Sequence, residues 1–218
     1  MAHGPAPFRN RAEAAALLAS ELACYDSAHP LVLAIPRGAL PMASIIAGRL
    51  GGDLDVVLVR KLRAPGNPEL AVGSVAESGW THVARHATEA AATQAYLERE
   101  KQSQLEVLRR QRARYTPRRA AIDAAGRTVI VVDDGLATGA TMIAALHAVR
   151  ARNPAQLVCA VPVASTEALT QVSGSADQVI SLVSSDEFDA ISRFYADFPQ
   201  VSDDEVVAIL EATHGGSG

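Results

Sequence analysis

The residues with the clearest capacity for chemistry lie in one unbroken run, from Thr128 to Ala144. Val129 to Val132 is a β-branched stretch that predicts a parallel strand buried on both faces, and Asp133 and Asp134 follow it directly. Such carboxylates accept hydrogen bonds from hydroxyl groups or hold a hard divalent cation through water. Because strands of an open α/β sheet present ligand-binding groups at their carboxyl ends, we expect both acids at a site, and solvated when it is empty.

A turn rich in glycine and threonine follows the two acids. Gly135 and Gly139 can adopt backbone angles that other residues avoid, and Thr138 and Thr141 can cap a helix that continues through residues 142–149. Free amides at the start of that helix would bind a phosphate. Acids at one end and phosphate donors at the other suit a ribose 5-phosphate, whereas two solvated aspartates before an ordinary turn are the plain structural alternative.

The run from Val129 to Thr141 resembles the phosphoribosyl diphosphate signature of the type I phosphoribosyltransferases. That signature has a hydrophobic strand, two acids, two variable positions, alanine or aspartate, and then Thr, Gly, any residue and Thr. The resemblance implies that Asp133 and Asp134 hold the ribose hydroxyls together with Mg²⁺. It also implies substrate contacts from the turn, with the 5-phosphate wrapped by the last five of these residues: Gly135, Ala137, Thr138, Gly139, Ala140 and Thr141.

A second anion site is predicted where an earlier strand ends. The apolar run Leu31 to Ile35 is followed by Pro36-Arg37-Gly38 and a helix over residues 40–50. Arg37 and the amides that follow it offer positive charge to an anion. Taken alone, an exposed arginine in an ordinary turn is the better interpretation, but the resemblance implies that Arg37 and Gly38 contact pyrophosphate.

A cluster of cations follows the next predicted strand, residues 55–60. Arg60, Lys61 and Arg63 repel one another, which a solvated loop tolerates and a polyphosphate would favour. The resemblance implies that Arg60 and Lys61 contact pyrophosphate there. The catalytic residues that we predict are therefore Asp133, Asp134, Arg37 and Lys61.

The remaining pattern predicts an α/β fold, with a mostly parallel sheet flanked by helices. Capping boxes at Asn10 with Glu13 and at Ser202 with Glu205 predict a first helix that runs on to Cys24 and a last helix near the end of the chain. Strands and helices alternate between them, as βαβ units do. Further strands are expected at residues 157–163 and 179–183, and a helix at 165–172.

Residues 62–120 are expected to form an insertion in a single domain over residues 1–218. A turn at Pro65-Gly66-Asn67-Pro68 and a hairpin within residues 64–85 would make a mobile loop over the site, followed by a helix over residues 88–113. From Glu98 to Arg119 there are eight Lys/Arg and three Glu. We favour a solvated basic face over nucleic-acid binding, because only Tyr115 is available there for base stacking.

Four of the nine aromatic residues gather near the end of the chain: Phe188, Phe194, Tyr195 and Phe198. They would ordinarily close the core. In the resembled family a small hood that grips the acceptor base follows the last strand, which implies stacking on the base by Phe188, Phe194 and Tyr195. We assign residues 1–28 and 184–214 to this hood. The segment Phe194 to Val206 also resembles the tail of a little-characterised bacterial subgroup.

The whole chain has the composition of an ordinary globular protein, with 218 residues, 49% hydrophobic and 20% charged. Two distant cysteines, and no apolar run that approaches the length of a membrane span, lead us to expect a cytoplasmic protein without a membrane partner.

The predicted function is Mg²⁺-dependent transfer of a phosphoribosyl group from phosphoribosyl diphosphate to a nitrogenous base, with release of pyrophosphate. The alternative is a regulatory protein that keeps the nucleotide site and binds RNA or DNA through the basic segment. A metal hydrolase is disfavoured, since no His/Asp cluster supplies further ligands. The acceptor base and a homodimer are left open.

Overall fold

The computed structural model describes residues 7–84, 87–117 and 120–214. Residues 1–6 of the predicted hood, residues 85 and 86 of the predicted insertion, and Arg118 and Arg119 of the basic segment lie outside the described residues, as does the end of the chain from 215.

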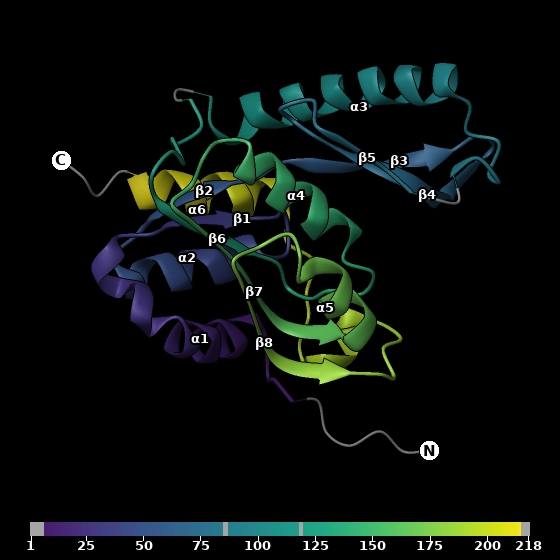
Figure 1. Cartoon of the computed structure of the whole chain (residues 1–218). Coiled ribbons are helices and arrows are strands. Elements are labelled where there is room, and N and C mark those ends of the chain that lie inside the picture. The colour runs from purple at the N-terminus through teal and green to yellow at the C-terminus, as the bar shows by residue number, and fades with distance from the viewer. Residues whose placement is uncertain (1–6, 85–86, 118–119, 215–218) are drawn as a thin grey trace.

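The central element is a five-stranded parallel sheet with the order β2-β1-β6-β7-β8 (Figure 1). The predicted α/β class is confirmed. Each strand is followed by a connection that returns to the same starting edge, so all five carboxyl ends meet at the opposite edge. The strands are β1 (Leu31–Ala34), β2 (Asp53–Val56), β6 (Thr128–Val132), β7 (Gln156–Ser165) and β8 (Gln178–Ser185).

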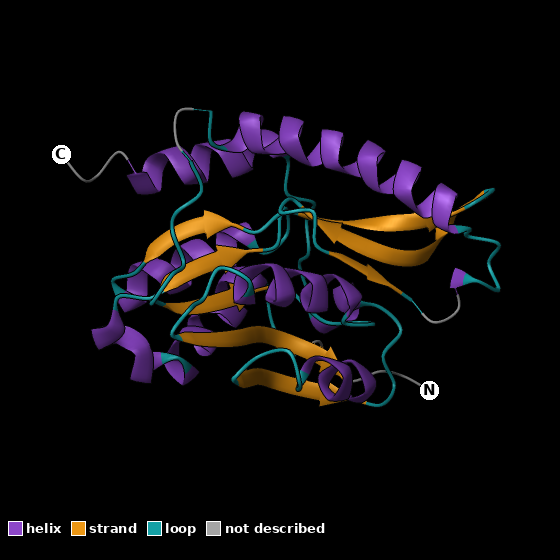
Figure 2. Ribbon diagram, turned by 45° about the horizontal axis from the view of Figure 1, so that its top comes forward, coloured by secondary structure: helices purple, strands orange, loops and turns teal. Residues whose placement is uncertain are grey.

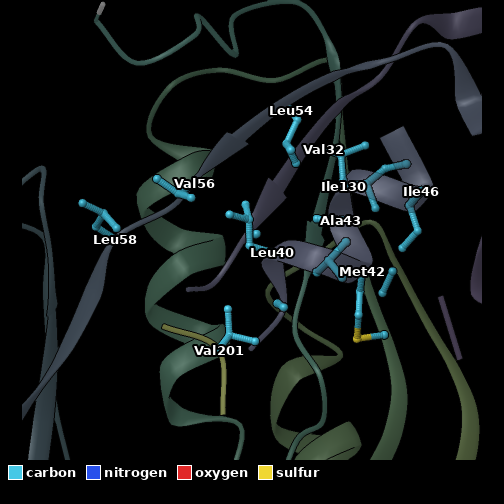
Figure 3. Close-up of a cluster of buried hydrophobic side chains, with 14 of the residues drawn as sticks. Val32, Leu40, Met42, Ala43, Ile46, Leu54, Val56, Leu58, Ile130 and Val201 are labelled. Carbon is cyan, nitrogen blue, oxygen red and sulfur yellow. The ribbon is translucent and has the colours of Figure 1, made fainter. Parts of the chain in front are cut away.

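Helices cover both faces of this sheet. Side chains alternate between the two faces along each strand, and the apolar side chains on each face pack against helices. Val32 and Ile130 belong to a buried cluster with one set of helices (Figure 3), whereas Leu33 and Val131 belong to a second cluster with the other set. A sheet buried on both faces needs the continuous apolar runs that the sequence has. The first set is α1 (Arg11–Glu21), α2 (Leu40–Leu50) and α6 (Asp203–His214), and the second is α4 (Ala140–Arg150) and α5 (Thr166–Val172).

A separate antiparallel sheet is formed by β3 (Val59–Ala64), β4 (Asn67–Ala76) and β5 (Thr81–Val83). It packs against the long helix α3 (Gln94–Tyr115), which lies along the antiparallel strands in Figure 2, and it also contacts α4. The turn expected near Gly66 is present between β3 and β4, and the hairpin expected after it, within residues 64–85, is formed by β4 and β5. Its mobility stays a prediction.

The single strand predicted over residues 55–60 is wrong. The chain pairs in parallel with β1 as far as Val56, and from Val59 it pairs antiparallel with β4 in the other sheet. The apolar residues Val57 and Leu58 between them are buried, which makes the break invisible in the hydrophobic pattern.

Helix boundaries follow the caps. Glu13 donates its amide to the Asn10 side chain at 3.0 Å, so the predicted first cap is confirmed, although α1 ends at Glu21 and a 3₁₀ helix, η1 (Ala23–Ala28), follows. Glu205 likewise donates its amide to Ser202 Oγ at 3.2 Å, as predicted for α6. A further 3₁₀ helix, η3 (Ile191–Phe194), lies in the tail.

The helix expected from residue 88 begins only at Gln94. The side chain of Thr93 accepts from the Tyr96 amide and caps it, while residues 88–91 form a turn in which Ala91 has a φ of 55°. The alanines and glutamate of that turn have high helix propensity, but tertiary context overrides this weak preference.

Trp80, between β4 and β5, connects the antiparallel sheet to α4. Its ring stacks on the His147 ring of α4, with centroids 4.5 Å apart and an angle of 13° between the planes. The His82 ring also stacks with Trp80, with ring centroids 6.3 Å apart. The contact fixes the turn between β4 and β5 against α4.

Within the described part of the chain, no helix combines the length and the apolarity that crossing a bilayer requires. Cys24 is exposed and Cys159 is buried, and both are free thiols.

Arg112 anchors α3 to the parallel sheet. It forms an ion pair at 3.1 Å with Asp55 of β2, whose side chain is 1% exposed, and a second ion pair with Glu77 after β4. Its Nη2 also donates to the Val56 carbonyl at 2.9 Å. The interpretation of the segment as a uniformly solvated basic face is therefore wrong at this position, because a buried carboxylate must be compensated.

We predict that Arg112→Ala lowers the free energy of unfolding by about 2 to 3 kcal/mol, since it removes the ion pair that Arg112 forms with the buried Asp55 carboxylate. Arg109→Ala is the matched control: Arg109 is an exposed residue of the same helix, and its loss should change stability by less than about 0.5 kcal/mol. Urea denaturation of both variants measures the difference. Equal stability of the two would show that Arg112 does not anchor the helix.

Candidate active site

The loops that follow β1 and β6 lie side by side, because these two strands are neighbours in register. Ala34 pairs with Val132, and the Ile35 amide donates to the Val132 carbonyl at 3.0 Å. The Pro36–Arg37 peptide bond in the first loop is cis. A Cβ added at Gly38 would lie 2.1 Å from Oδ2 of Asp134, so only glycine allows the first loop to approach the acids so closely.

Asp134 is held by a buried arginine, Arg11, that no motif in the sequence indicates. Nη2 of Arg11 pairs with Asp134 Oδ2 at 2.9 Å, and Nε donates to the same oxygen at 3.1 Å. Arg11 also donates to the Pro199 carbonyl at 2.6 Å and lies 3.6 Å from the centroid of the Phe198 ring. The hydroxyl of Tyr195 donates to the Asp134 backbone carbonyl at 2.8 Å.

The expectation that both acids are solvated is wrong, since both are partly buried. Burial raises the pKa of Asp133 well above its usual range, and the neighbouring Asp134 carboxylate raises it further. Burial also raises the pKa of Asp134, although Arg11 opposes that shift. Asp133 has no ion pair with a described residue. The site therefore concentrates negative charge that a cation would relieve.

The turn after the acids is fixed by the end of β7. The Leu136 amide donates to the Val163 carbonyl at 2.9 Å, the Ser165 amide donates to Leu136, and Ser165 Oγ donates to the Ala137 carbonyl at 2.8 Å. A Cβ at Gly135 would lie 2.8 Å from Val163 Cγ2, so this residue also needs to be glycine. The loop is held in shape before any ligand arrives.

The start of α4 is open to a ligand. Gly139 is the N-cap residue, with a φ of 73°, and no side chain caps the helix. The prediction that Thr138 and Thr141 cap it is therefore wrong. The first amides of a helix have no partner within the helix, so those at Ala140 and beyond remain available to an anion.

A pocket of about 140 Å³ lies over this loop. Lys61 of β3, Asp133 and Ile191 of η3 line it together with the loop itself. The structure thus brings Lys61 to the predicted phosphate turn. Nothing in the sequence around Ile191 indicates its place here, which depends on how η3 folds back. The lining residues from the turn and α4 are Gly135, Leu136, Ala137, Thr138, Gly139, Ala140, Thr141 and Met142.

Arg37 and Arg60 lie in a different and larger pocket, of about 520 Å³. Successive residues of a strand face opposite ways, so Arg60 points to α3, where its Nε donates to Gln104 Oε1 at 2.6 Å, while Lys61 points to the signature loop. The three cations predicted to act together are therefore divided between two pockets. Arg60 and Lys61 enter different pockets because they are successive residues of β3 and therefore face opposite sides of the antiparallel sheet.

The aromatic residues of the tail stack mainly on one another. Ring centroids of Phe188 and Phe194 are 5.0 Å apart, and those of Tyr195 and Phe198 are 4.8 Å apart. Tyr195 is 4% exposed and belongs to the core, while Phe188 and Phe194 are partly buried and do not line the signature pocket. Their contact with a base stays a prediction.

The segment before α1 pairs with the tail segment around η3, beside the acids. The Phe8 amide donates to the Phe194 carbonyl at 3.1 Å, and the Ala196 amide donates to the Phe8 carbonyl at 2.8 Å. This ladder places the tail next to α1, from which Arg11 reaches Asp134. The hood assigned to residues 1–28 and 184–214 remains a prediction.

The carboxylates of Asp133 and Asp134 suit a metal ion that takes most of its ligands from water and from a substrate. Among the residues that the structure describes, no group of three or more His, Cys, Asp or Glu could hold an ion. Mg²⁺ is commonly bound through one or two carboxylates, with waters and substrate phosphates completing the octahedron. Asp133 and Asp134 fit that arrangement.

A parallel sheet with an acid pair, a fixed glycine-rich turn and an uncapped helix at its carboxyl edge defines the α/β proteins that bind ligands at a strand switch point. A family model described as the phosphoribosyl transferase domain matches residues 5–199, and the chain belongs to this family.

Known proteins resemble the chain over most of its length. Two proteins from strains of Mycobacterium tuberculosis, each named "Putative phosphoribosyl transferase", are 39% identical over 211 residues, which are 95% of this chain and 47% of each relative. The chain therefore spans about half the length of these relatives. The crystal structure of TT1426 from Thermus thermophilus is 47% identical with a TM-score of 0.80, covering 93% of this chain and 97% of the other.

We predict that neutralising Asp133 stabilises the fold at pH 7, and does so more than neutralising Asp134. Because the pKa of Asp133 is raised on folding, the stability that this group contributes is present at low pH and lost as the pH rises through the folded value. Asp133→Asn should therefore raise the melting temperature at pH 7, with a difference that shrinks as the pH falls toward about 4. Asp134→Asn should raise the melting temperature less, because Arg11 opposes the rise of the Asp134 pKa and loses its carboxylate partner in the variant.

Differential scanning calorimetry of both variants from pH 4 to 8 measures this. A destabilised Asp133→Asn variant at pH 7 would contradict the inferred charge strain.

Proposed function

We propose that the protein transfers a phosphoribosyl group from phosphoribosyl diphosphate to a nitrogenous base, in a Mg²⁺-dependent reaction that releases pyrophosphate. The observation that carries the proposal is the juxtaposition, in a member of this family, of the strained acid pair with a preformed anion pocket at the same sheet edge. Both ends of a ribose 5-phosphate would find complementary groups there.

Each pocket has a distinct role in this proposal. Asp133 and Asp134 hold the ribose hydroxyls and would hold Mg²⁺, which supplies positive charge to the departing diphosphate. The segment Ala137 to Thr141 binds the 5-phosphate through its amides, with Lys61 adding a positive charge in the same pocket. Arg37 and Arg60, in the larger pocket, bind the pyrophosphate.

Such a transfer builds positive charge on the ribose ring and negative charge on the leaving group. The protein must therefore orient the base against the ring and stabilise both charges more than it needs a strong nucleophile. Ile191, which lines the signature pocket from the tail, joins Phe188 and Phe194 as a candidate contact to the base.

The regulatory alternative depends on α3 as a nucleic-acid surface. Arg112 is committed to Asp55 and Glu77, and Arg110 and Arg114 line the larger pocket. These arginines are not available together as one open face, so the enzyme is favoured. Salt-sensitive RNA binding without turnover would support the regulator instead.

The central prediction is that pyrophosphate release requires phosphoribosyl diphosphate, Mg²⁺ and a base together. Asp133→Asn should lower kcat/KM by roughly a hundredfold, because the ribose and the metal lose a shared carboxylate. Asp204→Asn is the control, since Asp204 is an acid with a 92% exposed side chain outside both pockets. A coupled pyrophosphate assay with a panel of bases measures both. Absence of release with every base would refute the proposal.

The acceptor is predicted from Ala137. In hypoxanthine-guanine members of the family this position is an Asp that assists the base at a ring nitrogen, and alanine has no acceptor atom. Loss of such a charge-assisted hydrogen bond costs about 1.5 to 3 kcal/mol, or roughly ten- to a hundredfold in rate. We expect poor use of hypoxanthine and guanine beside adenine and pyrimidines at equal concentration. Efficient turnover with guanine would overturn this inference and leave the phosphoribosyl site intact.

A further inference from the structure

The larger pocket brings together cations from three separate parts of the chain. Arg37 comes from the loop after β1, Arg60 from β3, and Arg110 and Arg114 from α3. Four guanidinium groups face one lining carboxylate, that of Asp203 at the start of α6. Only the first two of these arginines lie at or just after the ends of predicted strands in the sequence, where an anion site is expected.

The two arginines of α3 are placed where their charges repel. They are four residues apart, so they project from the same face of the helix, and like charges at this spacing destabilise a helix. Arg110 has no ion pair with any residue that the structure describes. Arg114 pairs with Asp203 and with Asp204, each at 2.8 Å. An anion in the pocket would relieve the repulsion between them.

Asp203 already acts as an internal anion. Besides Arg114, it lies 4.0 Å from Arg37 and accepts a hydrogen bond from the Tyr115 hydroxyl at 2.5 Å. Its carboxylate thus occupies part of the charge field that the arginines create. A ligand with more negative charge than one carboxylate would compete with it for the same guanidinium groups.

The loop that carries Arg37 also connects this pocket to the acids. A Cβ added at the next residue, Gly38, would lie only 2.1 Å from Asp134 Oδ2. The loop therefore passes directly against the proposed ribose site. A diphosphate attached to a ribose held by the acids would therefore enter the pocket from this loop.

We propose that α3 supplies part of the diphosphate site: Arg110 and Arg114 complete a polyphosphate pocket with Arg37 and Arg60, and Asp203 is the counter-ion that the diphosphate displaces. This rests on the proposed function for the identity of the diphosphate as that of phosphoribosyl diphosphate. The binding of inorganic pyrophosphate itself can be measured without any turnover.

Titration calorimetry with inorganic pyrophosphate, at low ionic strength and fixed Mg²⁺, tests the arginines. Arg110→Ala should weaken binding on the order of tenfold, as loss of a charge-assisted hydrogen bond predicts. Arg109→Ala, an equal change of charge on the exposed surface of the same helix, should stay within about twofold. Ribose 5-phosphate should bind equally to both variants. Equal pyrophosphate affinity of the two variants, or equal losses for both ligands, would overturn the assignment.

A variant of Asp203 tests the counter-ion role, because it should change pyrophosphate affinity in the opposite direction from the arginine variants. Asp203→Asn removes the internal competitor and should tighten pyrophosphate binding several-fold. Glu211→Gln, which removes the same charge from the exposed surface of the same helix, should stay within about twofold. Unchanged or weaker binding by Asp203→Asn would refute the counter-ion role.

The two proposals fail separately. Pyrophosphate binding with the expected order of variants but no turnover with any base would remove the enzymatic function and keep the pocket. Turnover together with indistinguishable Arg110→Ala and Arg109→Ala variants would keep the function and remove the pocket.

Discussion

The parallel pairing of β1 with β6 is the constraint on which the site depends. It places the loop that carries Arg37 and Gly38 against the loop that begins at Asp133, although about a hundred residues separate them in the sequence. After β2 the chain leaves the parallel sheet to form the antiparallel sheet and α3, and it returns at β6. The insertion can therefore differ without moving the two loops, because their positions are fixed by hydrogen bonds between the neighbouring strands.

That arrangement concentrates charge, and the fold compensates only part of it. Arg11 neutralises Asp134 from the first turn of α1, and the tail supports Arg11 through the Pro199 carbonyl and the Phe198 ring. Asp133 receives no equivalent cation from the described residues. Charge strain of this kind is typical of a binding site, where stability is given up for affinity.

The sequence predicts best what is local. The acid pair, the glycine-rich turn and the capping boxes each depend on neighbours within a few residues. They can therefore be predicted from the sequence without knowledge of the fold. Arg11 and Ile191 were missed because their roles come from contacts across the whole chain, with residues such as Asp134 that are far away in sequence.

Errors of the prediction have physical reasons too. Residues 55–60 read as one strand because the buried residues between β2 and β3 continue the apolar pattern across a change of sheet. Arg60 and Lys61 were expected to act together because they are adjacent, yet adjacency in a strand sends them to opposite faces. The threonines were expected to cap α4, but Gly139 takes that position and leaves the amides free.

The contact of Trp80 with His147 gives the protein an internal optical reporter. Trp80 is the one tryptophan in the sequence, and its ring stacks on a side chain of the helix whose first turn lines the signature pocket. Indole emission responds to the polarity and the stacking of the ring, and it can be excited apart from the tyrosines. Fluorescence from a single site therefore follows whether the antiparallel sheet, which carries Lys61, stays packed against α4 while ligands enter and leave.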